Sequence, residues 1–420
     1  MLKFKFKEVS FTTKELIELE NKYGAHNYEP LPVVLERGKN IFVWDVDGKK
    51  YYDFLSAYSA VNQGHSHPRI IDALTEQAKK ITLTSRAFYN SELGKYEKYI
   101  TNLFGYDKVL PMNTGAEAVE TAIKIARKWG YEKKGIPSGE AKIVVCNGNF
   151  HGRTTTIISF SNDEDARKNF NPYTSGFISV EYNDVESLKE IIEKDADTIC
   201  GFLVEPIQGE AGVNVPDEGY LSATYEICKA NNVLFIADEI QTGIARTGKM
   251  LAVDHENVKP DMLILGKALS GGVYPVSAVL ANDEIMNVIK PGQHGSTFGG
   301  NPLACSVAVE ALQVVLDENL TENAQKMGEI FRLEVEKMIE KYDFLQAVRG
   351  KGLLNAILIN DTPESSTAWD FCIDLMNNGL LAKPTHGNII RFAPPLVIDK
   401  TEMMNALGVL DKTCMEFKKK

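Results

Sequence analysis

The sequence lacks the features that mark membrane, secreted and nucleic-acid-binding proteins. None of its apolar runs approaches the length that crosses a bilayer. The basic start at residues 1–7 has no uninterrupted apolar stretch behind it, which argues against a secretory signal. There is no basic tract, and the formal net charge is -11. Neither a membrane nor a nucleic-acid partner is therefore expected.

Cysteine is scarce, and the six cysteines are scattered without a Cys-x-x-Cys pair. Because they stand mostly among apolar residues, they are interpreted as reduced core thiols, and the expected location is cytoplasmic. Two histidines, His65 and His67, precede Pro68. They are interpreted as turn residues before a helix, since no third ligand is near in sequence. No metal is expected.

The chain does contain a regular alternation of short apolar runs with helical stretches. This alternation predicts a mostly parallel sheet that is covered on both faces, with ligands at the carboxyl ends of its strands. The predicted strands are residues 109–110, 143–145, 199–204, 233–237 and 262–265.

A length of 420 residues predicts more than one domain. Residues 1–55 are expected to form an N-terminal arm and a hairpin that pack with the small domain. A large α/β domain is predicted over residues 56–305, and a smaller α+β domain over residues 306–420. The hairpin is expected to turn at Asp47-Gly48.

Lys267 follows Gly266 at the end of the apolar run 262–265. An amine at the end of a buried strand is poorly solvated, which lowers its pKa toward the free base. Only the neutral amine attacks a carbonyl, so Lys267 is a candidate Schiff-base lysine. The alternative is an ordinary salt-bridge partner.

Other strand ends carry groups that suit a phosphorylated pyridine. Asp238 ends an apolar run, and a buried carboxylate needs a positive partner such as the protonated ring nitrogen of pyridoxal 5'-phosphate (PLP). Gly115 opens a helix whose free N–H groups could bind phosphate. Phe150 could stack on a flat ring. The alternatives are a structural carboxylate, a plain cap with Thr114 and Glu117 at capping-box spacing, and a core aromatic.

Together these residues resemble the class III PLP-dependent aminotransferases. Lys267 follows the Asp238 block by 29 positions, and the matching blocks stand in the family's usual order. The resemblance implies PLP as cofactor, the type I fold of PLP-dependent transferases, and a homodimer whose active site is shared between subunits. The blocks are residues 113–118, 150–154, 238–243, 266–272 and 294–302.

Within that family, further blocks resemble the ornithine δ-aminotransferases. The resemblance extends from about residue 20 to the C-terminus. One small departure from many class III relatives is Phe150, where they have tyrosine. The N-terminal arm has no clear counterpart. The further blocks are residues 24–28, 56–65, 205–212, 348–354 and 391–396.

The resemblance implies a role for each cofactor contact. Lys267 would form the imine with PLP and later move a proton between the substrate carbon and the cofactor. Asp238 would pair with the pyridine nitrogen. The ring face, the phenolic oxygen and the phosphate would be contacted by Phe150, by Gln241, and by Gly115 and Ala116 together with Thr297 of the neighbouring subunit.

The resemblance also assigns substrate contacts. Tyr28, Tyr58 and Arg153 would receive ornithine, with Arg153 on its α-carboxylate. Arg391 would bind the α-carboxylate of the 2-oxo acid in the second half-reaction. Glu210 would mask Arg391 while ornithine is bound, through an ion pair that can open. For Arg391 the alternative is a surface ion pair.

The expected activity is transfer of the δ-amino group of L-ornithine to 2-oxoglutarate, giving glutamate 5-semialdehyde, which cyclises, and glutamate. Acetylornithine and 4-aminobutyrate define the alternative aminotransferases of the same family. A protein of a different class, a non-catalytic scaffold with the PLP fold, is the remaining alternative. The intact pair of Lys267 and Asp238 speaks against it.

Overall fold

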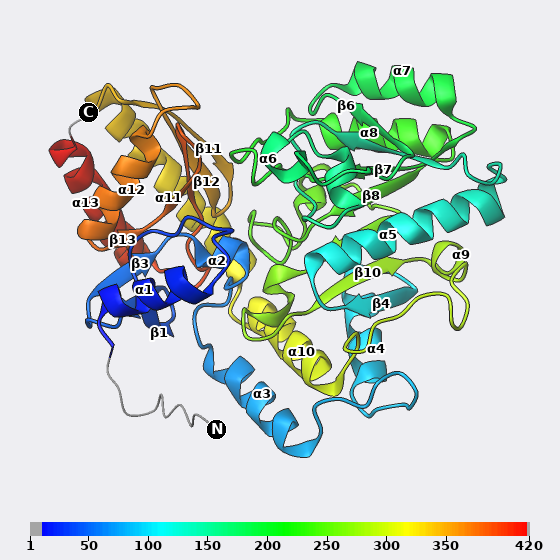
Figure 1. Cartoon of the computed structure of the whole chain (residues 1–420), viewed down its shortest axis with the longest axis horizontal. Helices are drawn as coiled ribbons and strands as arrows, with labels where there is room; N and C mark the ends of the chain where they lie inside the picture. Colours follow the sequence, from blue (N-terminus) through cyan, green and yellow to red (C-terminus); the bar gives the residue numbers. More distant parts are fainter. Residues whose placement is uncertain (1–10, 418–420) are drawn as a thin grey trace.

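The structure is a computed structural model that describes residues 11–417, and its elements form two parts that lie side by side. The larger part is built from the middle of the chain, from α3 (Pro68–Lys80) to β10 (Ser277–Ala281). The smaller part combines the start of the chain, including α1 (Thr13–Tyr23), with the C-terminal elements (Figure 1).

The larger part is organised by a seven-stranded sheet with the order β4-β10-β9-β8-β7-β5-β6. The predicted mostly parallel sheet is confirmed, because only β10 runs antiparallel to its neighbours, β4 and β9. The strands β6 and β10 were not predicted. The other bounds are β4 (Lys108–Met112), β5 (Lys142–Cys146), β6 (Phe177–Val180), β7 (Ile199–Val204), β8 (Leu234–Asp238) and β9 (Met262–Leu265).

Helices cover both faces of this sheet, as the alternation predicted. Because successive side chains of a strand point to opposite faces, β8 places Leu234 and Ile236 against α5, and Phe235 on the other face with Leu188 and Leu221. All residues of β7, β8 and β9 are buried. The covering helices are α5 (Gly115–Trp129), α7 (Val185–Asp195) and α8 (Tyr220–Ala230).

The smaller part has an antiparallel sheet with the order β11-β12-β15-β14 and the helices α11, α12 and α13. The sequence predicts helices over residues 321–341, 369–377 and 400–417 and strands over residues 352–359 and 388–392. The helices and the strands β12 and β15 agree with these positions, whereas β11 and β14 were not predicted. The bounds are α11 (Leu320–Lys341), β11 (Leu345–Lys351), β12 (Leu354–Ile359), α12 (Thr367–Asn377), β14 (Lys383–His386), β15 (Ile389–Phe392) and α13 (Lys400–Glu416).

The predicted N-terminal hairpin is present and joins the C-terminal elements. Its strands β2 and β3 are antiparallel, and β3 pairs in parallel with β13. Two elements that are far apart in sequence thus share one small sheet, of order β1-β2-β3-β13. The bounds are β1 (Leu35–Lys39), β2 (Phe42–Asp45), β3 (Lys50–Asp53) and β13 (Leu380–Leu381).

Helix α10 (Pro302–Asp317) crosses the predicted domain boundary at residues 305/306. It packs on the large part, where its Val307, Ala311 and Val314 contact Ile70 of α3. It also lies along α4 (Leu93–Phe104) (Figure 1). The division into domains stays a prediction.

The six cysteines are all buried and free, as interpreted from the sequence. Burial raises the pKa of each thiol, for example to about 12 for Cys146 and Cys305. His65 and His67 pair with Asp53 and Glu318 respectively. Between residues 11 and 417, no three His, Cys, Asp or Glu side chains gather as a metal site. None of the helices in this range has the length and apolarity needed to cross a bilayer.

Candidate active site

The carboxyl ends of β8 and β9 and the start of α5 open onto one cavity, as expected for a sheet of this topology. Seven cofactor contacts are expected from the sequence, and the structure brings six of them to this cavity. Thr297 is the exception. The six are Gly115, Ala116, Phe150, Asp238, Gln241 and Lys267.

Lys267 stands just after β9 and opens a short 3-10 turn, Lys267–Ser270. Its backbone φ is 43°, in the left-handed region that non-glycine residues rarely adopt. Burial lowers the pKa of Lys267, and the positive charge of Arg391 lowers it further, whereas Glu210 acts in the opposite direction. The surroundings therefore favour the neutral amine that a nucleophile at a carbonyl requires.

Asp238, the last residue of β8, is 4% exposed and has a close partner that was not predicted. Nδ1 of His151 lies 2.6 Å from its Oδ2, and the backbone N–H of Ile240 donates to its Oδ1 at 3.1 Å. Burial acts to lower the pKa of His151, but the hydrogen bond and charge of Asp238 outweigh it and raise the pKa. His151 therefore gives the buried Asp238 a partner that can carry a positive charge.

His151 follows Phe150 directly in the sequence. The sequence pointed only indirectly to its contact with Asp238. A buried carboxylate requires a donor or a positive charge. Several strand ends could have supplied it, and only the fold shows that the residue beside Phe150 does so.

Glu205, the residue after β7, is a second buried carboxyl group at the cavity. Burial raises its pKa to about 7, although His151 opposes this shift. Its Oε2 accepts a hydrogen bond of 2.9 Å from the backbone N–H of Phe150. Glu205 thus fixes the backbone that carries both Phe150 and His151.

The start of α5 is a regular capping box, as its sequence predicted. Oγ1 of Thr114 accepts from the N–H of Glu117, and the Glu117 carboxylate accepts from the N–H of Thr114. The cap leaves the first two helical residues, Gly115 and Ala116, lining the cavity. A Cβ at Gly115 would lie 3.1 Å from the side chain of Ile240, so glycine gives the backbone its close approach here.

This set of groups fits PLP. A helix start suits the phosphate, a buried carboxylate suits a protonated ring nitrogen, an aromatic ring suits the ring face, and a neutral amine suits the aldehyde. All four line the same cavity, through Gly115, Asp238, Phe150 and Lys267.

Beside this cavity, the buried Arg391 forms an ion pair of 2.7 Å with Glu210, whose side chain is 26% exposed. Gln241 donates to Glu210 at 3.0 Å and accepts from Arg391 at 3.0 Å, so its amide bridges the pair. Although burial acts to raise the pKa of Glu210, the charge of Arg391 lowers it overall. Arg391 is 2% exposed, which excludes a surface ion pair. The contact of Gln241 with the phenolic oxygen stays a prediction.

Tyr58 covers Arg391, whose Cζ lies 5.0 Å from the centre of the tyrosine ring. Tyr58 belongs to α2 (Ser56–Ser59), a single turn whose four residues all have φ between 47° and 70°. The turn is therefore left-handed although it contains no glycine. Oδ1 of Asp53 accepts from the N–H groups of Leu55 and Ser56, which fixes its start.

Tyr28 and Arg153 lie together at a second cavity of about 750 Å³. Both are exposed there, and Tyr28 is 74% exposed. The guanidinium of Arg153 is 5.6 Å from the ring of Phe150, which lines the first cavity. The predicted ornithine contacts are thus divided, with Tyr58 beside Arg391 and the other two at the outer cavity.

Thr297 is exposed and does not line the cavity of its own chain. Its neighbour Ser296 accepts a hydrogen bond of 2.8 Å from the amide of Asn113, close to the start of α5. Its predicted contribution to a neighbouring subunit stays a prediction.

Comparison with known proteins decides the family. The family model "Aminotransferase class-III" matches residues 23–414. The chain belongs to the class-III aminotransferases. It is 60% identical over 396 residues to the "Ornithine aminotransferase, mitochondrial" of Drosophila melanogaster, covering 94% of this chain and 90% of that protein. It is 58% identical to the protein of the same name from Rattus norvegicus, covering 97% and 91%.

Solved structures of class-III aminotransferases agree in fold. An ornithine aminotransferase of Toxoplasma gondii, described with partial occupancy of PLP at its active site, has a TM-score of 0.94 at 49% identity, over 96% of this chain and 94% of the other. An acetylornithine aminotransferase of Elizabethkingia anophelis has a TM-score of 0.90 at 64% identity, over 97% and 100%. The type I fold and PLP dependence predicted from the sequence are confirmed.

Proposed function

We propose that this class-III aminotransferase is an L-ornithine:2-oxo-acid δ-aminotransferase. The observation that carries the proposal is the ion pair of Glu210 with the buried Arg391 beside Lys267. Ornithine aminotransferases of other organisms, 53% to 60% identical over most of the chain, support it.

The cofactor supplies an aldehyde that accepts the amino group and a ring that withdraws electrons from the reacting carbon. Lys267 lines the cavity where this carbon would stand, and its Nζ, whose pKa burial lowers, would take up the proton from the δ-carbon of ornithine. Asp238, which His151 contacts at 2.6 Å, would face the ring nitrogen and favour its protonated form. Phe150 would cover the ring, and the N–H groups of Gly115 and Ala116 would bind the phosphate.

The pair of Glu210 and Arg391 explains how one site presents the δ-amine first. An unpaired arginine beside Lys267 would attract the α-carboxylate of ornithine and so bring its α-amine to the reacting centre. With Glu210 bound to Arg391, the α-carboxylate is left for Arg153 at the outer cavity. Tyr28 lies beside Arg153 at the outer cavity, and Tyr58 lies over Arg391. In the second half-reaction Glu210 releases Arg391, which then binds the α-carboxylate of 2-oxoglutarate.

Acetylornithine is the second candidate substrate. The structure named acetylornithine aminotransferase is 64% identical to this chain, so its substrate must be tested beside ornithine. Acetylornithine also reacts through its terminal amine and has a free α-carboxylate. The same pair of Glu210 and Arg391 serves both substrates, which differ only in the acetyl group on the α-amine.

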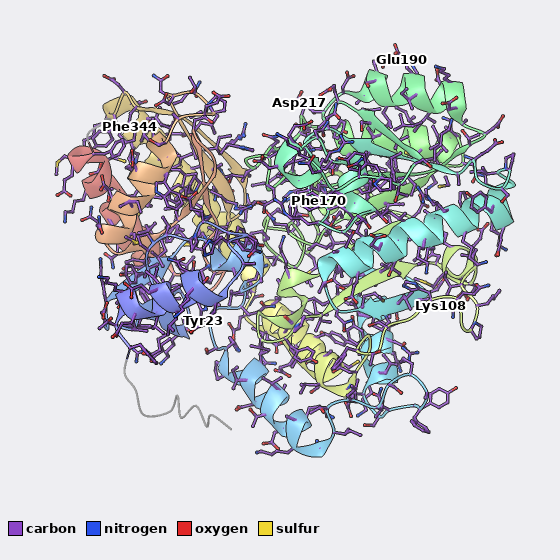
Figure 2. All side chains as sticks on the ribbon, in the orientation of Figure 1. Tyr23, Lys108, Phe170, Glu190, Asp217 and Phe344 are labelled. Carbon is purple, nitrogen blue, oxygen red and sulfur yellow. The ribbon has the colours of Figure 1, made fainter. Side chains whose placement is uncertain are left out.

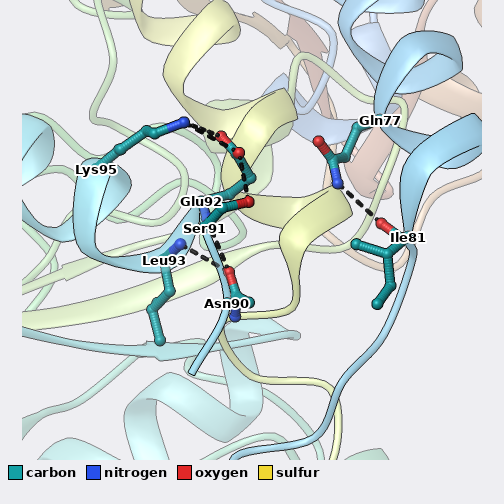
Figure 3. Close-up of polar contacts among 7 residues, drawn as sticks. All are labelled: Gln77, Ile81, Asn90, Ser91, Glu92, Leu93 and Lys95. Atoms are coloured by element: carbon teal, nitrogen blue, oxygen red, sulfur yellow. Dashed lines mark hydrogen bonds and ion pairs between the residues drawn. The ribbon is translucent and has the colours of Figure 1, made fainter. Parts of the chain in front are cut away.

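A homodimer is proposed as the working unit. The loop 81–92 exposes Phe88 and Tyr89, and the loop 291–301 exposes Phe298 beside Thr297. Gln77 binds the carbonyl of Ile81 at one end of the first loop, and Asn90 caps the start of α4 at the other (Figure 3). Asn90 also donates to Gly300, so the two loops are neighbours. Exposed aromatic residues on such ordered loops suit a second copy that would receive Thr297.

The expected cytoplasmic location is kept as part of this proposal. Six buried free thiols suit a reducing compartment. The relatives in Drosophila melanogaster and Rattus norvegicus are named mitochondrial, so cell fractionation has to decide between the two locations.

A substrate panel tests the function. Purified holoenzyme is mixed in turn with ornithine, acetylornithine, lysine and 4-aminobutyrate, and loss of the cofactor's visible absorption band is followed in a single turnover. We expect the highest kcat/KM for ornithine and a cyclised semialdehyde as product. A higher value for acetylornithine or 4-aminobutyrate, with no cyclised product from ornithine, would overturn the proposal. A protein that stays colourless with added PLP would favour a scaffold.

Lys267→Ala tests the assigned nucleophile. We expect turnover with ornithine to fall by at least about a thousandfold, because nucleophile and proton carrier are lost together. Steady-state assay of product formation measures this, and circular dichroism checks the fold. Undiminished turnover in a folded variant would place the reactive amine elsewhere.

A further inference from the structure

Residues 24–30 form an arm that carries Tyr28 to the outer cavity. The arm follows Tyr23, the exposed last residue of α1 (Figure 2). All of its residues are exposed and outside helices and strands. Such a segment has little packing to fix the position of Tyr28.

One side chain ties this arm to the smaller part. Nζ of Lys383 donates a hydrogen bond of 2.5 Å to the backbone carbonyl of Glu29. The other hydrogen bonds recorded for residues 25–30, within the described chain, stay inside the arm or reach Asn21 of α1. The position of the arm over the cavity therefore depends on this one ammonium group.

Lys383 is itself held by its surroundings. It is half-buried on β14, and its Nζ lies 5.2 Å from the ring centre of Trp369, which lines the same cavity. Its backbone is paired with Arg391 in the register of β14 and β15. Directly opposed residues of an antiparallel pair point to the same face of the sheet. Lys383, which anchors the arm, and Arg391, the arginine of the second half-reaction, are therefore neighbours on two paired strands.

We propose that Lys383 is a positioning residue that holds the arm, and hence Tyr28, over the outer cavity and so sets the affinity for the first amino substrate. This inference rests on the proposed ornithine activity. The residue does not touch the reacting atoms. It acts in the first half-reaction, which uses Tyr28 and Arg153, and leaves the second, which uses Arg391, unaffected.

Lys383→Met tests this, because it keeps an apolar stem of similar length but removes the ammonium group that donates to Glu29 and lies over the ring of Trp369. In single-turnover absorbance experiments on the holoenzyme, we expect the half-saturating ornithine concentration to rise about tenfold, the effect of one charge-assisted hydrogen bond. The limiting rate, and the reaction of the amine form of the enzyme with 2-oxoglutarate, should change by less than about twofold. Hydrogen–deuterium exchange should become faster in the peptide that covers residues 24–30.

Three further variants make the test specific. Lys383→Arg retains a donor and should restore most of the affinity. In a Tyr28→Ala background, Lys383→Met should raise the half-saturating ornithine concentration by less than about twofold more, because the two residues act through one contact. Lys134→Met is the matched control. Lys134 is also half-buried and donates to three carbonyls, those of Ile199, Asn231 and Asn232, at the amino end of β7 away from the cavity.

The outcomes separate the positioning role from the proposed function. Unchanged exchange of the arm, unchanged ornithine dependence, or equal losses in both half-reactions of Lys383→Met would each overturn the positioning role. If the unmodified enzyme does not react with ornithine, the proposed function fails, and with it the role in ornithine affinity. Even then the exchange of residues 24–30 in Lys383→Met against Lys134→Met decides whether Lys383 holds the arm.

Discussion

At the scale of the residue, the ion pair of Glu210 and Arg391 has to meet opposite requirements in the two half-reactions. Arg391 must be unavailable to one substrate and available to the next. Gln241 contacts both partners, so it can keep either one hydrogen-bonded when the pair opens. The pair is therefore built as a switch whose closed state joins the two charges, while Nε of Arg391 has no hydrogen-bond partner within residues 11–417.

Glu210→Ala tests this switch. It frees Arg391 at all times, so we expect kcat/KM for ornithine to fall by at least about tenfold while reaction with glutamate becomes faster. Single-turnover kinetics with each amino acid measure the two values. Glu210→Gln keeps a partner for Gln241 and should give an intermediate result. Equal losses for ornithine and glutamate would contradict the masking role.

Glu239 is not among the residues that line the cavity, and its raised pKa predicts how the stability of the folded protein depends on pH. Burial raises its pKa to about 7, despite hydrogen bonds from Thr242 and from the N–H of Val253. A carboxyl whose folded pKa is raised favours the folded state below its unfolded pKa of 4.5, and this contribution is lost as the pH rises to about 7.

In Glu239→Gln the neutral amide stands in for the protonated acid. We expect the variant to gain free energy of unfolding relative to the unmodified protein between pH 5 and pH 8, by up to about 3 kcal/mol. Denaturant titrations of the cofactor-free protein at both pH values measure the change. A difference that does not vary with pH would show that Glu239 does not titrate in this range.

At the scale of the element, the left-handed turn α2 concentrates strain beside the site. Each non-glycine residue in this conformation costs about 1–2 kcal/mol. The turn persists because Asp53 binds its start and because Ser56 and Ser59 are buried. The strain is thus coupled to the presentation of Tyr58 against Arg391.

Ala57→Gly is the variant that isolates this strain. Ala57 is exposed with φ 47°, so glycine removes a steric cost without removing a buried contact. We expect a stabilisation of about 0.5–1 kcal/mol, since relief of strain exceeds the added entropy of the unfolded chain. Thermal unfolding measures it, with Ala25→Gly in the exposed arm as the control, where no gain is expected. A destabilised Ala57→Gly would show that the turn is not strained there.

Elements with a strong pattern were predictable, and those defined by their neighbours were not. The apolar runs of β7, β8 and β9 are buried on both faces, and such runs are visible in the sequence. The strand β10 was missed because its antiparallel place between β4 and β9 depends on the rest of the sheet. The turn α2 contains no glycine, so its positive φ values could not be predicted from the sequence.

In the candidate site, too, some residues could be predicted from the sequence pattern and others could not. Strand ends predicted Lys267 and Asp238, because parallel strands bring their carboxyl ends to one edge. The residues that tune these groups, His151 and Glu205, lie in segments whose approach is set by tertiary packing. The anchor at Lys383 depends on β14, a strand that the sequence did not predict.

At the scale of the whole molecule, one buried arginine connects the two parts. Arg246 is fully buried, and burial lowers its pKa. Its guanidinium donates to Oδ1 of Asn62, to the carbonyl of Leu353 at 2.9 Å and to the carbonyl of Pro394 at 2.7 Å. The segment between α2 and α3, the large part and the C-terminal part of the chain therefore meet at a single side chain.

Arg246→Met should loosen this junction. Three acceptors lose their donor, so we expect the free energy of unfolding to fall on the order of 3 kcal/mol. Thermal unfolding followed by circular dichroism measures the loss. The control is Arg37→Met, at an exposed arginine that lies over Trp44. There the free energy of unfolding should change by about 0.5 kcal/mol or less. Equal shifts in both variants would contradict the role of Arg246.

The burial of all six cysteines has a practical consequence for measuring motion. Thiols whose pKa is raised by burial react slowly with alkylating dyes, because the thiolate is the reactive form. A single new cysteine on the exposed arm, Asn27→Cys, would therefore be labelled ahead of the native ones. Fluorescence of a dye at that position would follow the arm above the cavity during each half-reaction, without removing any native cysteine.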